Sequence, residues 1–181
     1  SYDWIVPEYG VLYGDFGPEG VADHVAEAGV TGTVLVQAAD TYEDTFYMLS
    51  VAASVPNVVG VVAWAPLDRT AEARAAVDLY AVSPWVKGVR VLNHTYDDPR
   101  WLLRADVSES ISLLASRGLA LDFVSVLDAH LESLSELAAR HRELTIVLDH
   151  MAKPPIATKG WEPWATLIAA APMLGGILLL S

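Results

Sequence analysis

The chain alternates between two hydrophobic periods. Short runs that are apolar almost without interruption are followed by longer stretches in which apolar residues recur every third or fourth position. The short runs are typical of parallel strands covered on both faces, and the longer period is typical of amphipathic helices. We predict strands at Gly32–Gln37, Val58–Trp64, Val86–Leu92, Leu119–Val124, Leu144–Asp149 and Ile177–Leu180. We predict helices at Pro18–Ala28, Thr41–Ser54, Thr70–Ala81, Asp106–Arg117, Ala129–Arg140 and Gly160–Ala171.

Cap and turn residues support several of these boundaries. Gly118 follows the helix that ends at Arg117, and glycine is favoured there because it adopts the left-handed conformation freely. Thr70 is predicted to cap its helix, with Glu72 in the first turn near the positive end of the helix dipole. The first segment, Ser1–Gly17, carries aromatic residues and proline and is predicted to be a loop.

Regular alternation of strand and helix predicts an α/β fold with a parallel sheet and external helices. A (β/α)8 TIM-type barrel and an open doubly wound sheet both fit, but no G-x-G-x-x-G loop follows a strand to support a dinucleotide fold. A full barrel has eight strands in usually about 250 residues. This chain of 181 residues has about six βα units. We therefore predict one domain over residues 1–181, a barrel that lacks the first and last strands.

The composition narrows the classes of function. Hydrophobic residues make up 53% and charged residues 19%, as expected for an ordered protein with a sizeable core. The net charge of −12 argues against nucleic acid as a partner, because phosphates would be repelled. The absence of cysteine excludes a disulfide scaffold and thiolate metal sites. No signal-peptide pattern is visible, and we expect a cytoplasmic location.

One segment could be mistaken for a membrane span. Residues Pro163–Ser181 carry no charge, but Pro172, Gly175 and Gly176 interrupt them. We interpret the segment as the end of a helix, a turn and a buried strand, with no membrane partner.

Polar and aromatic residues gather where the predicted strands end. Ligands of such folds bind at the carboxyl ends of the strands, so these positions are the first candidates for chemistry. They are Gln37 with Asp40, Trp64 with Asp68, Arg90 with Asn93 and His94, Asp122, and Asp149 with His150 and Lys153. We expect four of them to converge on one pocket: Gln37, Trp64, Arg90 and His150.

His150 lies in the most specific stretch, LDHMAKPP over residues 148–155. An apolar strand that runs straight into Asp-His places an imidazole at the barrel mouth, where it can act as a general base or a metal ligand. Asp149 could fix its tautomer, although adjacent strand residues point to opposite faces. The alternative is a histidine that is merely hydrogen-bonded at a strand end, and the local pattern leaves both open.

Arg90 presents a guanidinium fork suited to a carboxylate or a lactone oxygen. The alternative is a structural salt bridge with Asp97, Asp98 or Asp122. Asp122 lies inside an apolar strand, so its charge must be paired or solvated.

The remaining histidines fall on predicted helices. His24 and His141 are expected at the surface, and His130, which begins a helix, is expected to be structural. No G-x-S-x-G elbow, H-E-x-x-H pair or P-loop is present, so a serine nucleophile or a helix-borne zinc site has no motif.

Several stretches together resemble a known family. In order along the chain they are Tyr2-Asp3-Trp4, residues 28–38 (AGVTGTVLVQA), residues 59–64 (VGVVAW), Lys87-Gly88-Val89-Arg90, residues 98–102 (DPRWL) and residues 148–155 (LDHMAKPP). The ordered set resembles the amidohydrolase-related proteins, the lactonase branch of the amidohydrolase superfamily, which includes L-fuconolactonase and 2-pyrone-4,6-dicarboxylate lactonase. The resemblance covers about residues 2–168.

The resemblance implies a (β/α)8 barrel that hydrolyses a sugar lactone or related cyclic ester by attack of water on the carbonyl. In that family a His-x-His pair lies on the first strand, a histidine on the sixth and an aspartate on the eighth. His150 matches the sixth-strand histidine, and Arg90 matches a position near the substrate. The His-x-His pair and the aspartate have no counterpart in residues 1–181, and Met173–Ser181 departs from the usual seventh-strand pattern. We therefore expect little or no lactonase activity from these residues alone.

The resemblance also implies roles for residues. An aspartate outside this chain would be the base, while His150 and Arg90 would polarise the carbonyl or hold a carboxylate. Gln37, Trp64, His94 and Lys153 are predicted to bind the small-molecule substrate. The cofactor is unknown, and a divalent metal such as zinc is compatible with the family.

Two alternatives stay open. The first is a non-catalytic barrel remnant, whose open sheet edges would be prone to pairing, so that a homo-oligomer is compatible with the sequence. The second is a metal-dependent decarboxylase of the same superfamily, which would need three histidine ligands where this chain supplies one.

Overall fold

The fold is α/β, with one parallel sheet of six strands. The computed structural model describes residues 2, 4–170 and 177–179, the last three by their backbone only. The strands lie in sequence order, and each pairs in parallel with the next. They are β1 (Thr33–Val36), β2 (Val58–Ala63), β3 (Val86–Arg90), β4 (Ala120–Phe123), β5 (Ile146–Leu148) and β6 (Ile177–Leu179). All six predicted strands are confirmed, although Leu180 lies outside the described residues.

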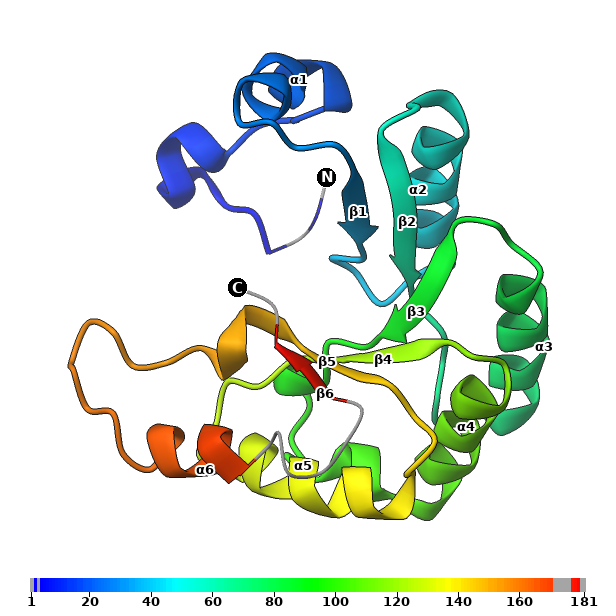
Figure 1. The fold of residues 1–181 in the computed structure, drawn as a ribbon, viewed down its shortest axis with the longest axis vertical. Coiled ribbons are helices and arrows are strands. Elements are labelled where there is room, and N and C mark those ends of the chain that lie inside the picture. Colours follow the sequence, from blue (N-terminus) through cyan, green and yellow to red (C-terminus); the bar gives the residue numbers. More distant parts are fainter. Residues whose placement is uncertain (1, 3, 171–176, 180–181) are drawn as a thin grey trace.

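The helices lie outside the curl of the sheet. They are α1 (Pro18–Glu27), α2 (Tyr42–Ser54), α3 (Thr70–Ala81), α4 (Ala105–Ser116), α5 (Asp128–Arg140) and α6 (Trp164–Ala170). Helices α2 to α5 cover the convex side of the sheet (Figure 1). This half-open arrangement confirms the predicted incomplete barrel.

Two predicted boundaries are wrong. The segment Ser1–Gly17, expected to be a loop, contains a 3-10 helix at Pro7–Leu12. The last helix begins at Trp164 rather than at Gly160. The predicted turn at Pro172, Gly175 and Gly176, and the end of that helix at Ala171, lie outside the described residues.

Two predicted caps have different outcomes. Thr70 does not cap α3, because Arg69 precedes the helix and the Thr70 hydroxyl instead donates to the Asp106 carbonyl at 3.4 Å. Gly118 has a φ of +68°, the left-handed conformation expected just after a helix.

Alternation along the strands separates the core from the candidate site. Val89, Leu121 and Leu148 are fully buried in the core cluster between the sheet and the helices. Arg90, Asp122 and Asp149 each directly follow one of these three buried residues. Successive side chains along a strand point to opposite faces of the sheet. The charged residues therefore lie on the concave side of the sheet.

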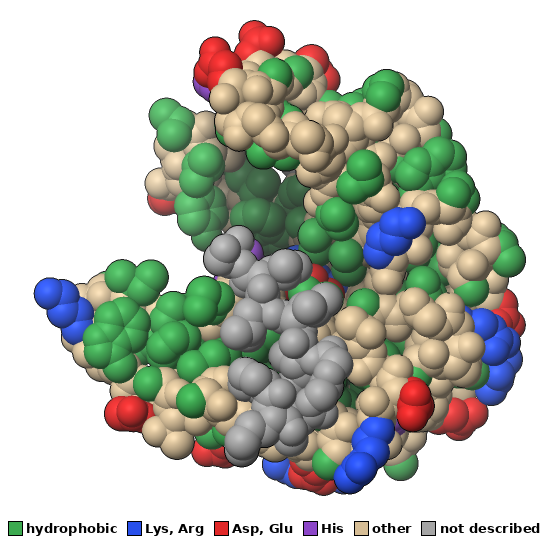
Figure 2. Space-filling view, viewed as in Figure 1, with side chains coloured by type: hydrophobic (Ala, Val, Ile, Leu, Met, Phe, Trp, Pro, Cys, Tyr) green, Lys and Arg blue, Asp and Glu red, His purple; other side chains and the backbone are tan. Residues whose placement is uncertain are grey.

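The N-terminal part of the chain is far less buried. No residue of Pro7–Leu12 or of α1 is buried, and Val34 on β1 is 49% exposed. Figure 2 shows hydrophobic side chains around the hollow between this part and the rest of the molecule. In the described part of the chain, no helix has both the length and the apolar character that crossing a membrane requires.

Candidate functional site

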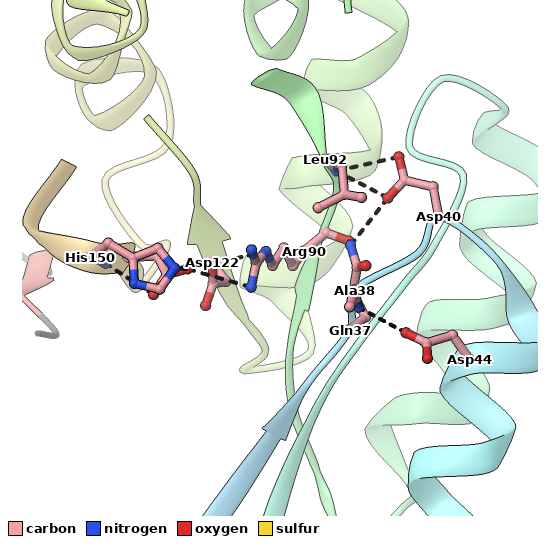
Figure 3. A network of polar contacts seen from close by, with 9 residues as sticks. Gln37, Ala38, Asp40, Asp44, Arg90, Leu92, Asp122 and His150 are labelled. Carbon is pink, nitrogen blue, oxygen red and sulfur yellow. Dashed lines mark hydrogen bonds and ion pairs between the residues drawn. The ribbon is translucent and has the colours of Figure 1, made fainter. Parts of the chain in front are cut away.

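Arg90 ends β3 and lies between two carboxylates. Its Nε is 3.8 Å from Asp122 Oδ1, and its Nη1 is 3.4 Å from Asp149 Oδ2. Register explains the first contact, because Arg90 and Asp122 are paired positions of neighbouring strands. The guanidinium points along the strand ends toward Asp122 and His150 (Figure 3). The structure thus pairs Arg90 with Asp122 and Asp149, not with Asp97 or Asp98.

Asp122 is the most deeply buried acid of this group, with 4% of its surface exposed. Burial raises the pKa of Asp122 to about 7, while Arg90 lowers it and Asp149 raises it. Asp122 Oδ1, Asp149 Oδ2 and Arg90 Nε are all buried without a hydrogen bond to a described residue. A buried polar group without a partner is unusual and is more common where a ligand or proton acts.

His150 reaches the same carboxylate from the far side. Its Nε2 lies 3.2 Å from Asp149 Oδ2, so that oxygen faces both Arg90 and His150. The side chain of His150 is more than half exposed, which leaves the imidazole accessible from solvent. The structure thus brings Asp149 and His150 into contact, as the tautomer hypothesis requires.

An unusual backbone turn places His150. Residues 150–153 all have a φ between +49° and +58°, directly after β5. Residues other than glycine visit this left-handed region rarely and usually singly, so four in a row store backbone strain. Such strain is concentrated at functional sites, where the surrounding structure holds it. No sequence signal for this turn is visible, since none of the four residues is glycine.

Further positive charge lies close to Arg90. Burial lowers the pKa of His94, and the nearby charges of Lys153 and Arg90 lower it further. His94 is half-buried with its Nδ1 unpartnered, and Lys153 is exposed. Lys153 is therefore the further positive charge near Arg90, whereas His94 is a mostly uncharged hydrogen-bonding group at neutral pH.

A second network joins the end of β1 to the end of β3, across β2. Asp40 accepts hydrogen bonds from Gln37 Nε2 (3.1 Å), the Leu92 amide (3.0 Å) and the Tyr96 hydroxyl (2.6 Å). Gln37 Nε2 also donates to the Arg90 carbonyl at 3.0 Å. Asp40, directly through Leu92 and indirectly through Gln37, therefore fixes the backbone at and just after Arg90 (Figure 3). Tyr96 was missed by sequence reasoning, because a tyrosine in a loop carries no distinguishing pattern.

Asp44 holds the N-terminal segment against the loop after β1. Its carboxylate accepts from the Ala38 amide (2.8 Å) and the Tyr2 hydroxyl (2.6 Å). Trp4 Nε1 donates to the Ala38 carbonyl at 2.9 Å. Burial and the hydrogen bond to Asp44 raise the pKa of Tyr2. Tyr2 and Trp4, which belong to the stretches that resemble the family, thus hold the N-terminal segment against the loop after β1.

The side chains of Gln37 and Trp64 are engaged in other contacts, and their predicted role in substrate binding stays a prediction. Gln37 is fully buried and its amide nitrogen is used by Asp40 and the Arg90 carbonyl. The Trp64 ring belongs to the core cluster and packs edge-on against Tyr42 at a centroid distance of 5.0 Å. Of the four residues expected to converge, only Arg90 and His150 meet at one atom, Asp149 Oδ2.

Of the other three histidines, two are buried in structural surroundings and one is exposed. The prediction that His141 lies at the surface is wrong: it is buried, with its ring nitrogens 3.0 Å from Ser108 Oγ and 3.3 Å from Ser112 Oγ. His24 is exposed as predicted. His130 is buried, and its Nδ1 accepts hydrogen bonds from the backbone amides of Val126 and Leu127. The proton of the neutral ring therefore lies on Nε2.

A small pocket adjoins the cluster without containing it. It has a volume of about 200 Å³ and is lined by Val126, Leu127, Asp128, Leu131, Ala152, Lys153, Pro155, Gly160, Glu162, Pro163 and Trp164. Lys153 is the one predicted site residue that lines it. Among the described residues, no three histidine, aspartate or glutamate side chains are grouped so that they fit a metal ion.

Comparison with known proteins places these features in a family. A family model described as amidohydrolase matches residues 5–174. L-fucono-1,5-lactonase from Burkholderia ambifaria is 36% identical over 161 residues, which are 89% of this chain and 55% of that protein. L-fucono-1,5-lactonase from Burkholderia multivorans is 27% identical over 162 residues, 87% of this chain and 52% of that protein. The chain thus spans about half the length of these curated relatives.

Solved structures show the same fold. An amidohydrolase from Burkholderia multivorans with bound zinc superposes with a TM-score of 0.89 at 23% identity, covering 98% of this chain and 63% of that chain. A probable 2-pyrone-4,6-dicarboxylic acid hydrolase from Acinetobacter baumannii, with citric acid bound, gives a TM-score of 0.67 at 17% identity, covering 92% and 62%. Since the family model spans almost the whole chain, the protein belongs to the amidohydrolase family.

Proposed function

We propose that the protein takes part in hydrolysis of a sugar lactone or related cyclic ester by attack of water on the carbonyl carbon. The observation that carries this proposal is the meeting of Arg90 and His150 at Asp149 Oδ2, on the concave side of the strand ends. The relatives named L-fucono-1,5-lactonase favour a sugar lactone over other esters.

The chemistry of the cluster fits this reaction. Attack of water turns the carbonyl oxygen into an oxyanion, which positioned donors stabilise strongly when water is excluded. The Arg90 guanidinium makes no hydrogen bond to a described residue, so its donors are available to an oxyanion or a carboxylate. His150 gives or takes a proton beside it as general acid or base. Lys153 adds positive charge toward the substrate, and the uncharged His94, whose Nδ1 has no partner among the described residues, is available for a hydrogen bond to it.

No step of this proposal uses a metal. A divalent ion such as zinc is bound in one solved relative, but the described residues of this chain do not form a ligand set for it. Gln37 and Trp64 serve this site through position: Gln37 supports the Arg90 backbone, and Trp64 packs in the core below. Residues 1–181 act as one domain in this proposal, because a single sheet runs from β1 to β6.

The test is hydrolysis of L-fucono-1,5-lactone, followed as acid release. This chain is assayed alone and also in place of the matching part of the Burkholderia ambifaria enzyme. We expect the chimera to hydrolyse the lactone, and its Arg90→Gln and His150→Ala variants to lose most of the activity. Asp97→Asn, an exposed acid outside the cluster, is the matched control. A folded chimera whose Arg90→Gln and His150→Ala variants keep full activity would refute the proposal, and a folded but inactive chimera would favour a non-catalytic remnant.

A further inference from the structure

Three ionisable side chains at the strand ends form a cluster with unequal charge. Arg90 supplies one positive charge, and Asp122 and Asp149 supply two negative charges when both are ionised. The side chains are 13%, 5% and 14% exposed, so solvent screens the excess negative charge poorly. An uncompensated buried charge is costly, and the usual relief is a proton or a counter-ion.

The contacts within the cluster are ion pairs without hydrogen bonds. Distances of 3.8 Å and 3.4 Å join Arg90 to the two carboxylates, beyond or at the limit of a good hydrogen bond. Arg90 Nε and Asp122 Oδ1 have no hydrogen-bond partner among the described residues. The guanidinium is therefore held in place by charge while its donors stay unused.

Two charged groups act directly on Asp122. Arg90 faces it from β3, and Asp149 faces it from the end of β5. His150 contacts Asp149, and the charges of Arg90 and Lys153 both act on His94. His130 on α5 also acts on His94, and burial lowers the pKa of both histidines. Because burial raises the pKa of Asp122 to about 7, Asp122 is the group of this cluster poised to exchange a proton near neutral pH.

We propose that Asp122 is the positioning residue of Arg90, and that a hydroxy-carboxylate ligand binds at Arg90 together with one proton that Asp122 takes up. The choice of ligand class rests on the proposed function, since hydrolysis of a lactone yields a hydroxy-carboxylate. The ligand adds a third negative charge beside the two carboxylates, and the proton removes one. Neutral Asp122 releases its hold on Arg90 Nε, so the fork can turn its donors to the ligand.

Proton uptake has a measurable consequence. Binding that consumes a proton weakens as pH rises, by up to about tenfold per pH unit above the midpoint of the free cluster. If Asp122 were purely structural, its substitution would change the free energy of unfolding, but ligand binding to the wild type would exchange no proton. The pH dependence of affinity therefore separates the two roles.

The experiment is calorimetric titration of the 181-residue chain with L-fuconate, the acid released from L-fucono-1,5-lactone, in two buffers of different ionisation enthalpy. At pH 7.5 we expect uptake of roughly three quarters of a proton per ligand. Asp122→Asn should bind without uptake and with the same affinity from about pH 6.5 to 8.5. Asp97→Asn should behave like the wild type, and neutral L-fucose should cause no uptake.

Several results would overturn the inference. They are L-fuconate binding to the wild type without proton uptake, uptake that persists in Asp122→Asn, and no binding of L-fuconate by the folded wild type. If the folded chimera does not hydrolyse the lactone but L-fuconate binding to this chain takes up a proton, only the proposed function is refuted. Hydrolysis without proton uptake would count against this inference alone.

A second measurement does not depend on a variant. Carbon-13 NMR of the aspartate carboxyls of the wild-type chain follows the ionisation of Asp122 directly. We expect a midpoint near 7 without ligand and a higher midpoint with saturating L-fuconate. A midpoint below about 5, the range of an ordinary aspartate, or one that L-fuconate does not move, would refute the inference.

Discussion

Asp40 and Asp122 stand at the ends of strands in the same sheet, yet their surroundings differ. The Asp40 carboxylate accepts hydrogen bonds from Gln37, Leu92 and Tyr96, the last at 2.6 Å. Asp122 is more deeply buried and its Oδ1 accepts none from a described residue. A satisfied carboxylate stabilises a fold, whereas an unsatisfied buried one is held ready for a proton or a ligand.

This difference divides the strand ends into two regions. Around β1 and the loop after β3, carboxylates join segments that lie far apart in sequence. Around β3, β4 and β5, charged groups face one another with donors left unused. Changes in the first region should therefore lower stability, and changes in the second should alter chemistry and its pH dependence.

The largest effect should follow His150→Ala. The side chain is exposed and holds no core, so its loss should leave stability within about 0.5 kcal/mol. Removal of a general acid or base typically lowers a rate by roughly 10²–10⁴-fold. Lactone hydrolysis by the chimeric enzyme measures the rate, and urea unfolding measures the stability. A stability loss as large as that of a core substitution would show that His150 is structural.

Asp40→Ala should lower the free energy of unfolding by about 3 kcal/mol, because it removes several charge-assisted hydrogen bonds and leaves their donors unpaired. Urea unfolding of the 181-residue chain with and without the substitution measures this loss of free energy. Asp97→Asn is the control and should change stability by less than about 0.5 kcal/mol. If the two variants were equally stable, Asp40 would not be the link between the strand ends.

Asp122→Asn should change how stability depends on pH. The folded state holds the proton of Asp122 up to about pH 7, whereas the unfolded state releases it near 3.8. The unfolded state thus binds fewer protons in this window, so wild-type stability falls as pH rises, by at most about 1.4 kcal/mol per unit. From pH 5 to pH 7 the variant should gain about 2–3 kcal/mol relative to the wild type. Urea unfolding across this range checks it, and a constant difference would contradict it.

The smallest effect should follow Tyr96→Phe, which removes one hydrogen bond to Asp40. We expect a loss of about 1–2 kcal/mol, since the acceptor is charged. Tyr42→Phe removes a matched hydrogen bond to the exposed Glu72 and should cost clearly less than Tyr96→Phe, because solvent screens the contact. Thermal or urea unfolding of both variants tests the contrast, which fails if the two losses are equal.

The sequence predicts the fold well where local pattern and tertiary packing agree. The six strands and α2 to α5 are apolar or amphipathic in the expected periods, and their bounds were found within a few residues. The 3-10 helix Pro7–Leu12 was missed because it has no buried residue and hence no apolar period.

The site was only partly predictable, for a physical reason. Arg90 and His150 could be found because they end strands, and strand ends of a parallel sheet share one edge. Pattern alone gave no warning that Gln37 would be buried and used by Asp40, or that the Trp64 ring would pack in the core. Side-chain direction after a strand depends on the turn that follows, and the left-handed turn at residues 150–153 has no sequence signature.

In the proposed reaction the Arg90 guanidinium stabilises the oxyanion, whereas Asp40 only holds the loop after β3 in place. The most direct test is steady-state lactone hydrolysis by Arg90→Gln and Asp40→Asn in the same chimeric enzyme, below the unfolding temperature of each. We predict that Arg90→Gln loses kcat/KM by at least about 100-fold even in protein that is still folded at the assay temperature. Asp40→Asn should lose stability first and keep kcat/KM within about tenfold while folded. Equal losses of kcat/KM in the two variants, or full activity in Arg90→Gln, would contradict it.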